Sequence, residues 1–538
     1  MVYTKPWVVD LILNLVGYTS DQPLNERLVV EPAAGEGSFL LPLVRRLIES
    51  CRRRAVPIVT CLSSVVAYEV DDASAALARA ALVDLLCLQG TNLCDSELLA
   101  DSWVRTGDYL MEAGDLAGRA DYVVGNPPYI RLEDLERGGA MYRAAYPTMV
   151  GRADIYIAFF EAALRHLRPG GACGYICADR WMLNQYGAEL RRFITKRFNV
   201  EAVIQMHHAA AFDVEVSAYP AVTVIRNAEQ GPVVVATLDP NAEKIGAAAL
   251  AAEFRPNAID ELRTTNAAVI EHWFDGSDPW PLVEPERLTL LRRLESQFRH
   301  LEVTGVTVGI GVATGADKVF ITKDPELVER ERLLPLAMAF DVRDSSVNWS
   351  GNYLVNPWNG NGLVDLSDYP RLASYLSQHR NQLLGRHVGQ KAPANWFRTI
   401  DRVNDRVTTM RKLYLPDFNG RISPVLDVGR TFPHHNLYFI VADIWDMEVL
   451  GGLLLSDVAQ FFIEAYCVRM RGGYLRFQAQ YLRRIRVPEP HSITLDQSQR
   501  LRLAFSSRDV NLANDVANEL YKLSPREGAI IGARESTS

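Results

Sequence analysis

Short apolar runs alternate with longer helical patterns along the first 227 residues of the chain. The apolar runs read as buried strands and lie at residues 28–31, 65–70, 104–106, 121–124 and 172–178. Helical periodicity falls around them, at 8–16, 40–48, 72–88, 154–167 and 186–198. Strands that alternate with helices form parallel sheets, so this pattern predicts a mostly parallel α/β sheet. Two further runs, 200–206 and 221–225, predict a final antiparallel pair.

The alternation fades beyond residue 227. Residues 228–300 read as a linker region with a helix near 284–297. Residues 301–490 mix short strand patterns, aromatic residues and Pro, Gly and Asn turns, which predicts a second domain of mixed α+β structure. The remainder, 491–538, predicts a C-terminal helix and a disordered tail. The chain is thus divided into an α/β domain over 1–227, a linker, a second domain and a tail.

The stretch from Asp121 to Tyr129 places a polar turn directly after a buried strand. Gly125 ends the strand, and the two prolines that follow cannot continue a ladder. The Asn126 side chain and the Pro127 carbonyl can both accept hydrogen bonds, and Tyr129 adds an aromatic face. Two acceptors beside a ring suit a planar group with an exocyclic NH₂, such as adenine. An ordinary strand-to-loop turn explains the same residues without any ligand.

Three earlier strands also end in groups that can bind a ligand. After the first strand, Glu31 leads into a small-residue turn in which Gly35 and Gly37 allow close approach of backbone to a ligand. The turn is not the dinucleotide-binding fingerprint, because position 40 is Leu. Glu69 ends the second strand and can accept both hydroxyls of a ribose, and Asp108 follows the third. Each could be an ordinary turn residue, but together they predict a ligand site along the sheet edge.

Composition places the chain among globular proteins without a membrane span. Hydrophobic residues make up 48% of it, enough for a sizeable core, yet no apolar run approaches about 18 residues. No secretory signal is visible near the N-terminus. The seven cysteines are scattered and odd in number, as expected for reduced thiols. We therefore expect a cytoplasmic protein with no membrane partner.

Charge is distributed unevenly. The net charge of −8 argues weakly against a nucleic-acid partner, but six Arg and no acid fall within residues 468–486. In that segment Arg469, Arg471 and Arg476 are candidate DNA-binding residues, because Arg is interleaved there with aromatic residues. A solvated helix face explains the segment equally well.

No metal site or nuclease site is expected. The pair His207-His208 lacks an evident third ligand. None of the eight lysines has an acid two residues before it, so the Glu-x-Lys or Asp-x-Lys core of a fused nuclease is missing. The glycine-rich run 309–315 lacks a Gly-Lys-Ser/Thr ending and reads as turns rather than a phosphate loop.

The order of these motifs resembles the gamma class of adenine-N6 DNA methyltransferases, the TaqI-like group with a C-terminal target-recognition domain. The resemblance covers residues 3–227 in order and spacing and, more loosely, 309–320, 434–438 and the stretch ending at Pro488. It implies a Rossmann-like S-adenosylmethionine methyltransferase sheet, mostly parallel with the last strand antiparallel, followed by a mixed α+β DNA-recognition domain. By motif, the cofactor would be surrounded by Thr4, Glu31, Ala33, Gly35, Gly37, Glu69, Asp108, Asn126 and Pro128.

The resemblance also implies a catalytic turn and a mechanism. Asn126, Pro127 and Tyr129 would hold a flipped-out adenine, and Phe212 would match the second aromatic that stacks on the base. An acidic run, Asp213 to Glu215, departs from the basic residues expected near DNA. The transfer would need no metal. Double-stranded DNA would be the partner, with a separate restriction endonuclease by family analogy only. Methyltransferases acting on protein glutamine N5 or on RNA adenine N6 remain alternatives, since the former share Asn-Pro-Pro-Tyr.

Overall fold

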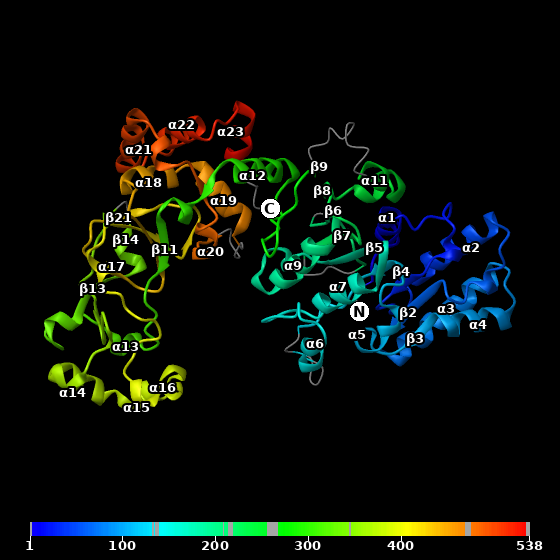
Figure 1. Cartoon of the computed structure of the whole chain (residues 1–538), viewed down its shortest axis with the longest axis horizontal. Coiled ribbons are helices and arrows are strands. Elements are labelled where there is room, and N and C mark those ends of the chain that lie inside the picture. Colours follow the sequence, from blue (N-terminus) through cyan, green and yellow to red (C-terminus); the bar gives the residue numbers. More distant parts are fainter. Residues whose placement is uncertain are drawn as a thin grey trace. The chain divides into compact units, whose positions relative to one another are not determined.

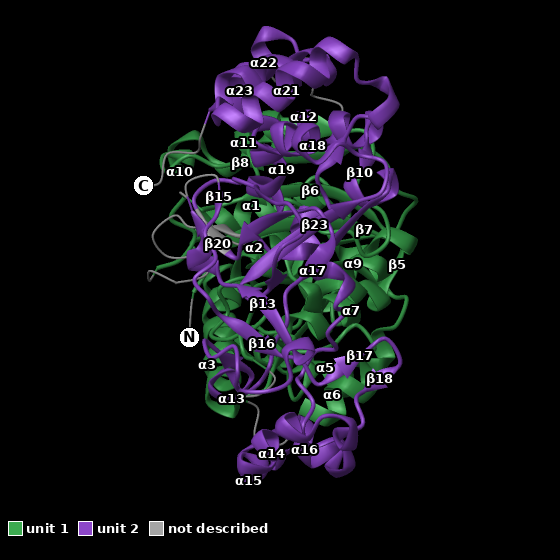
Figure 2. Cartoon of the chain, turned by 90° about the vertical axis from the view of Figure 1, so that its left-hand side faces the viewer, with its two compact units in different colours: residues 1–289 green, residues 290–538 purple. Residues whose placement is uncertain are grey.

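The computed structural model describes residues 3–131, 134, 139–207, 209–213, 219–254, 267–343, 346–467 and 475–533. The chain divides into two compact units, Met1–Thr289 and Leu290–Ser538 (Figure 2). Each unit is described by itself. Among the described residues no single helix is long and apolar enough to cross a membrane. One bent pair of helices, Met447–Leu454 and Asp457–Tyr466, would be long and apolar enough if its two members are taken together.

The first unit is built on a nine-stranded sheet flanked by helices (Figure 1). Its strands follow the order β3-β2-β1-β4-β5-β7-β6-β8-β9. Their bounds are β1 Val29–Glu31, β2 Val65–Glu69, β3 Val104–Thr106, β4 Ala120–Gly125, β5 Leu167–Ala178, β6 Asn199–Gln205, β7 Pro220–Arg226, β8 Val233–Thr237 and β9 Ala267–Ile270. Strands β1 to β5 pair in parallel, whereas β7 is antiparallel to both β5 and β6. The predicted Rossmann-like fold, with an antiparallel pair formed by 199–205 and 220–226, is confirmed.

Amphipathic helices bury their apolar faces against this sheet. The helices of the first unit are α1 Pro6–Val16, α2 Leu40–Arg53, α3 Asp72–Leu88, α4 Leu93–Trp103, α5 Tyr109–Glu112, α6 Gly139–Ala145, α7 Tyr156–His166, α8 Arg180–Leu183, α9 Ala188–Arg197, α10 Ala242–Ile245 and α11 Ala247–Glu253. α1 lies close to β5. A Cβ added to Gly174 of β5 would lie only 2.5 Å from Val16 Cγ1 and 2.9 Å from Ile12 Cγ2 of α1. Each fully buried aliphatic side chain of this kind stabilises the fold by about 1.5–3 kcal/mol. This packing fixes the helix that follows Thr4.

The prediction of a linker over residues 228–300 is wrong for much of that range. β8 pairs in parallel with β6, and β9 pairs with β8, so both strands extend the sheet of the first unit. The prediction failed because it relied on strand–helix alternation, and β8 follows β7 with no helix between them. The predicted helix is α12, Pro285–Gln297, close to the boundary between the units.

The second unit contains two four-stranded sheets and several helices. One sheet has the order β11-β23-β19-β21 and the other β12-β16-β13-β22. Their strands are β11 Val306–Ile310, β12 Ile321–Thr322, β13 Leu333–Ala337, β16 Tyr353–Val355, β19 Lys412–Pro416, β21 Val425–Asp427, β22 Phe432–Pro433 and β23 Leu437–Ala442. Two-residue strands pair elsewhere, at β10 Arg299–His300, β14 Val342–Arg343, β15 Ser346–Val347, β17 Trp358–Asn359, β18 Gly362–Leu363, β20 Phe418–Asn419, β24 Leu475–Arg476 and β25 Arg486–Val487.

Helices complete the second unit and correct the predicted tail. They are α13 Asp317–Phe320, α14 Pro370–Gln378, α15 Arg380–Leu384, α16 His387–Lys391, α17 Arg406–Thr409, α18 Met447–Leu454, α19 Asp457–Tyr466, α20 Ala479–Leu482, α21 Leu495–Ser507, α22 Val510–Leu520 and α23 Pro525–Gly532. The tail prediction expected one helix followed by disorder, whereas the structure has three helices as far as Gly532. α23 is stabilised by a capping box between Ser524 and Glu527 and by an ion pair of Glu527 with Arg293 (2.8 Å).

Candidate active site

Two polar turns meet where the strand order of the first sheet reverses. β1 and β4 are neighbours, with Val30 paired to Val123, so their carboxyl ends lie side by side. A Cβ on Gly125 would lie 3.6 Å from Pro32 Cδ and 3.9 Å from Glu31 Cγ. The turn after β1 and the Asn-Pro-Pro-Tyr turn after β4 are therefore adjacent. Open α/β sheets bind their ligands at such a switch point.

The carboxylate of Glu69 holds the glycine turn that follows β1. The Gly35 N–H donates to Oε2 of Glu69 at 2.8 Å, and the Asp71 N–H donates to Oε1 at 2.9 Å. Gly35 and Gly37 have φ angles of +55° and +101°, which side chains other than glycine rarely adopt. Each carboxylate oxygen of Glu69 keeps a second lone pair, so the same residue can still accept hydroxyl groups of a ligand.

Glu31 is a buried carboxyl that accepts a backbone hydrogen bond from Phe39 but keeps one oxygen unpartnered. Its side chain is 1% exposed, and Oε2 has no hydrogen-bond partner in the part of the chain that the structure describes. Burial, together with the negative charge of Glu69, raises the pKa of the Glu31 carboxyl well above its usual range. An unpaired buried acceptor costs free energy, so a ligand that brings a cationic amine or another donor would be stabilised here.

Asp108 is already engaged by two donors. Its Oδ1 accepts from the Leu110 N–H at 2.9 Å as the N-cap of α5, and its Oδ2 accepts from the Tyr142 hydroxyl at 2.7 Å. Burial and the bond to Asp108 raise the pKa of Tyr142. Tyr142 lies on α6, 34 residues after Asp108, and no sequence pattern links the two residues.

The Asn-Pro-Pro-Tyr turn holds its aromatic ring firmly. Asn126 and Tyr129 are half-buried and Pro127 is buried. The Tyr129 hydroxyl donates to the Ile176 carbonyl of β5 at 3.4 Å, and its ring meets Tyr156 edge-on with centroids 6.2 Å apart. Burial raises the pKa of Tyr129, so the phenol stays neutral. The turn can thus present an amide, a carbonyl and a fixed ring to a planar ligand.

Thr4 and Phe212 are brought together by backbone pairing. They form an isolated antiparallel bridge, flanked by a 3.0 Å hydrogen bond from the Lys5 N–H to the Ala211 carbonyl. Thr4 is 5% exposed, and its hydroxyl has no partner among the described residues. Phe212 is 7% exposed and packs within the main apolar core of the unit. Its ring would have to become accessible before a base could stack on it.

A further acid at the end of a buried strand, Asp179, was not recognised from the sequence. Asp179 follows β5 and is 4% exposed, and its Oδ2 lies 2.6 Å from Nε2 of His207, just beyond β6. The rule that singled out Glu31 and Glu69, an acid at the end of a buried strand, also applies to Asp179. His207 had been considered only as one of a histidine pair, and His208 lies outside the described residues.

Two of the three candidate DNA contacts lie in a part of the second unit that the structure does not describe. Arg469 and Arg471 lie outside the described residues. Arg476 lies on β24, which pairs with β20. These three residues remain predictions.

Comparison with known proteins connects this chain to one class of enzyme. The sequence model of the family described as "Eco57I restriction-modification methylase" matches residues 90–212 of this chain. The chain is 41% identical to type II methyltransferase M.PaeR7I of Pseudomonas aeruginosa over 99% of this chain and 93% of that protein. It is 40% identical to type II methyltransferase M.XhoI of Xanthomonas vasicola over 98% of each. Among solved structures, the type IIL restriction-modification enzyme MmeI in complex with DNA shares the fold, with a TM-score of 0.54 and 11% identity over 98% of this chain and 75% of that one.

Proposed function

Because the chain belongs to the type II methyltransferases of restriction-modification systems, we propose that it methylates the N6 amino group of an adenine flipped out of double-stranded DNA. The observation that carries this proposal is the meeting of Glu31 and Asn126 at the switch point of the sheet. One side of the site offers the buried carboxyl of Glu31, whose Oε2 lacks a donor among the described residues. The other offers the acceptors and the ring that suit an adenine.

The proposed methyl donor is S-adenosylmethionine, which supplies an electrophilic methyl group when bound. Glu31 would accept a hydrogen bond from the ammonium group of this donor, since its buried Oε2 has no partner among the described residues. Glu69 would accept the ribose hydroxyls through its remaining lone pairs. Asp108 would accept the adenine amino group, in competition with Tyr142. Thr4, Ala33, Gly35, Gly37 and Pro128 would line the same pocket.

The catalytic turn would position the target base. Asn126 Oδ1 and the Pro127 carbonyl would each accept one N–H of the adenine amino group, which favours a pyramidal nitrogen whose lone pair points at the methyl group. Stacking on Tyr129 would offset part of the cost of flipping, at about 1–3 kcal/mol per base. Phe212 would add a second face once its ring is accessible. Much of the rate would come from this positioning.

The second unit would select the DNA site, which agrees with the gamma-class order of a catalytic half followed by a recognition half. A separate restriction endonuclease would be the cellular counterpart, as expected for a modification enzyme of a restriction-modification system. The proposal assigns no cleavage to this chain.

The direct test separates binding from transfer. Asn126→Ala should nearly abolish methyl transfer to DNA while the affinity for S-adenosylmethionine, measured by calorimetry, stays close to that of the wild type. Asn511→Ala, an exposed asparagine on α22, is the matched control and should behave as the wild type. Full transfer by Asn126→Ala would overturn the assignment. Labelled methyl appearing on glutamine of a protein or on RNA, but not on DNA, would favour the two alternative substrates.

A further inference from the structure

Three side chains with metal-binding atoms converge in the second unit. Asp317 begins α13, and His434 and His435 lie between β22 and β23. Backbone pairing brings the two segments together, because Val312 and His434 form a parallel bridge and the His435 N–H donates to the Val312 carbonyl at 3.1 Å. One oxygen and two ring nitrogens of the three residues all lie within 4.8 Å of one another.

The separations of these atoms fit ligands around a single ion. Nε2 of His434 lies 3.3 Å from Oδ2 of Asp317 and 3.0 Å from Nδ1 of His435. Metal–ligand bonds of about 2.0–2.2 Å place neighbouring ligand atoms of a tetrahedral or octahedral site roughly 3 Å apart. The three atoms therefore need little rearrangement to share a cation.

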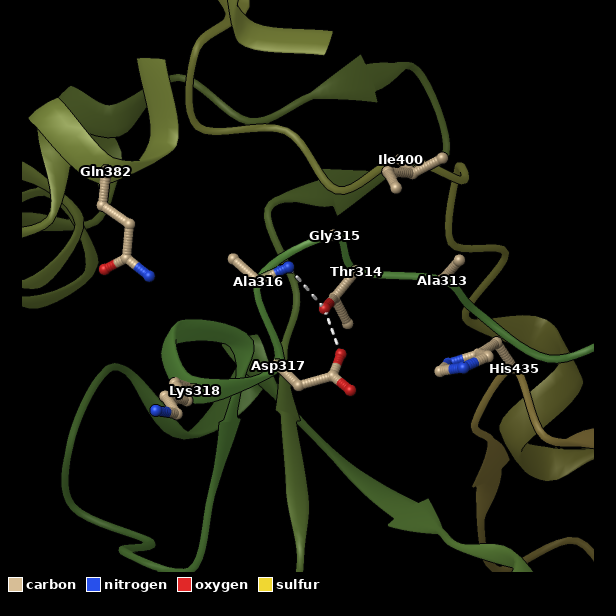
Figure 3. A pocket seen from close by; sticks show the side chains of 9 residues that line it. All are labelled: Ala313, Thr314, Gly315, Ala316, Asp317, Lys318, Gln382, Ile400 and His435. Carbon is tan, nitrogen blue, oxygen red and sulfur yellow. Dashed lines mark hydrogen bonds between the residues drawn. The ribbon is translucent and has the colours of Figure 1, made fainter. Parts of the chain in front are cut away.

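Neighbouring groups orient two of the three ligands. The Thr314 hydroxyl, which is fully buried, donates to Oδ1 of Asp317 at 2.5 Å (Figure 3). Oδ2 of Asp317 is left to face His434. Nδ1 of His434 lies 2.9 Å from Oδ1 of Asn436, so it carries the proton and donates. Nε2 of His434 then presents a lone pair. Hydrogen bonds of this kind to the far side of a ligand are typical of metal sites.

In this tautomer a lone pair of His434 faces a carboxylate oxygen of Asp317, and two acceptors repel each other. A cation between them turns the repulsion into attraction. Two alternatives need no metal. A proton on Nε2 would make an ion pair of His434 and Asp317, and a proton on Nδ1 of His435 would let that ring donate to Nε2 of His434. These explanations differ from the metal site in that the cluster would retain no metal ion.

We propose that Asp317, His434 and His435 bind a divalent transition-metal ion, with Zn²⁺ as the reference case. Two imidazoles and one carboxylate form a ligand set that suits zinc and its neighbours. Asp317 and His435 are exposed and line a pocket of about 500 Å³, and the His435 ring points toward the Asp317 carboxylate (Figure 3). A fourth coordination position therefore faces the pocket. The ion would join the loop after β11 to the turn before β23.

The proposed site departs from the expectation that the chain binds no metal. That expectation considered the histidine pair 207–208, for which no third ligand was evident. The pair 434–435 has its third ligand 117 residues before His434, a distance at which spacing rules give no signal. The proposal is independent of the proposed methyl transfer.

The test uses the untagged full chain and Zn²⁺ or Co²⁺ as the probe. We expect one Zn²⁺ per chain by calorimetry and d–d absorption of Co²⁺ typical of nitrogen and oxygen ligands. Asp317→Asn and His435→Gln should each weaken Zn²⁺ binding at least about 10-fold, and Thr314→Val should weaken it by about 10–100-fold through loss of orientation. Both ligand positions are exposed, and circular dichroism with the ion removed checks that each variant folds like the wild type.

The matched control is His387→Gln, an exposed histidine on α16, which should bind Zn²⁺ as the wild type does. Substoichiometric Zn²⁺ in the wild type would overturn the proposal. Equal Zn²⁺ affinities of the wild type, Asp317→Asn and His435→Gln would overturn it as well.

Discussion

Thr4 and Phe212 are paired as an isolated antiparallel bridge, although more than 200 residues of the chain separate them. The Asp213 N–H, donating to the Tyr3 carbonyl at 3.2 Å, extends the pairing. Thr4 belongs to the proposed cofactor pocket and Phe212 to the proposed base pocket. The backbone pairing therefore links the segment of the proposed cofactor pocket to the segment of the proposed base pocket.

Phe212 should matter most when the base has to leave a stable duplex. Phe212→Leu keeps an apolar side chain in the core but removes the aromatic face, so we expect weaker methylation of fully paired DNA. A mismatch opposite the target adenine lowers the cost of flipping and should restore part of the loss. Initial rates on matched and mismatched duplexes measure the effect. The same fractional loss on both duplexes would show that Phe212 does not assist flipping.

Glu31 should make stability depend on pH. Burial and the charge of Glu69 raise the pKa of Glu31 in the folded state above its value in the unfolded chain. The stability that this carboxyl contributes is therefore fully present below the unfolded-state pKa, and it is lost as the pH rises through the folded-state pKa. Glu31→Gln removes this loss. Without cofactor, the Tm of Glu31→Gln relative to the wild type should therefore rise with pH above about 4.5, the ordinary value for glutamate.

The control for this pH series is Glu36→Gln, an exposed carboxyl in the same turn. Its Tm difference from the wild type should not follow the trend of Glu31→Gln. A Tm difference between Glu31→Gln and the wild type that is constant with pH would contradict the explanation.

Removing the carboxylate of Glu31 should also weaken binding of S-adenosylmethionine. A hydrogen bond between charged groups is worth about 1.5–3 kcal/mol, so the Kd of Glu31→Gln should rise at least about 10-fold. Calorimetry gives the Kd, and Glu36→Gln again serves as control. An unchanged Kd would place the ammonium group away from Glu31.

Tyr142 should compete with the cofactor for Asp108. Tyr142→Phe frees Oδ2 of the Asp108 carboxylate. Since a hydrogen bond to a charged group is worth about 1.5–3 kcal/mol, the affinity for S-adenosylmethionine should increase by about 10-fold or more. Tyr146→Phe, which loses a hydroxyl bonded to the Leu110 carbonyl instead, is the control. Weaker cofactor binding by Tyr142→Phe alone would show that the hydroxyl supports the pocket.

Gly174 should be intolerant of a side chain. The Cβ of Gly174→Ala would lie 2.5 Å from Val16 Cγ1, so α1 or β5 must shift, at a cost of about 1–3 kcal/mol. Urea unfolding of the first unit measures the change in its free energy of unfolding. Gly114→Ala, where nothing lies within 4 Å of the new Cβ, should change it much less. Equal effects would mean that α1 is loosely packed.

The parts of this fold that the sequence predicted are those with a local signal. Strands β1 to β7 were recognisable because each is a short apolar run, and Glu31, Glu69, Asp108 and Asn126 could be grouped because parallel strands end at one edge. β8 and β9 were missed because no helix separates β8 from β7. The contact of Tyr142 with Asp108 and the approach of Asp317 to His434 depend on how distant segments fold together, which no spacing rule reports.

The central claim is that the Asn126 turn methylates adenine in DNA. Long-read sequencing of DNA from cells that express either the wild type or Asn126→Ala tests it most directly. We expect N6-methyladenine at one reproducible sequence motif in cells with the wild-type protein and none at that motif with Asn126→Ala. Unmodified adenines with the wild-type protein, or equal modification with Asn126→Ala, would contradict it.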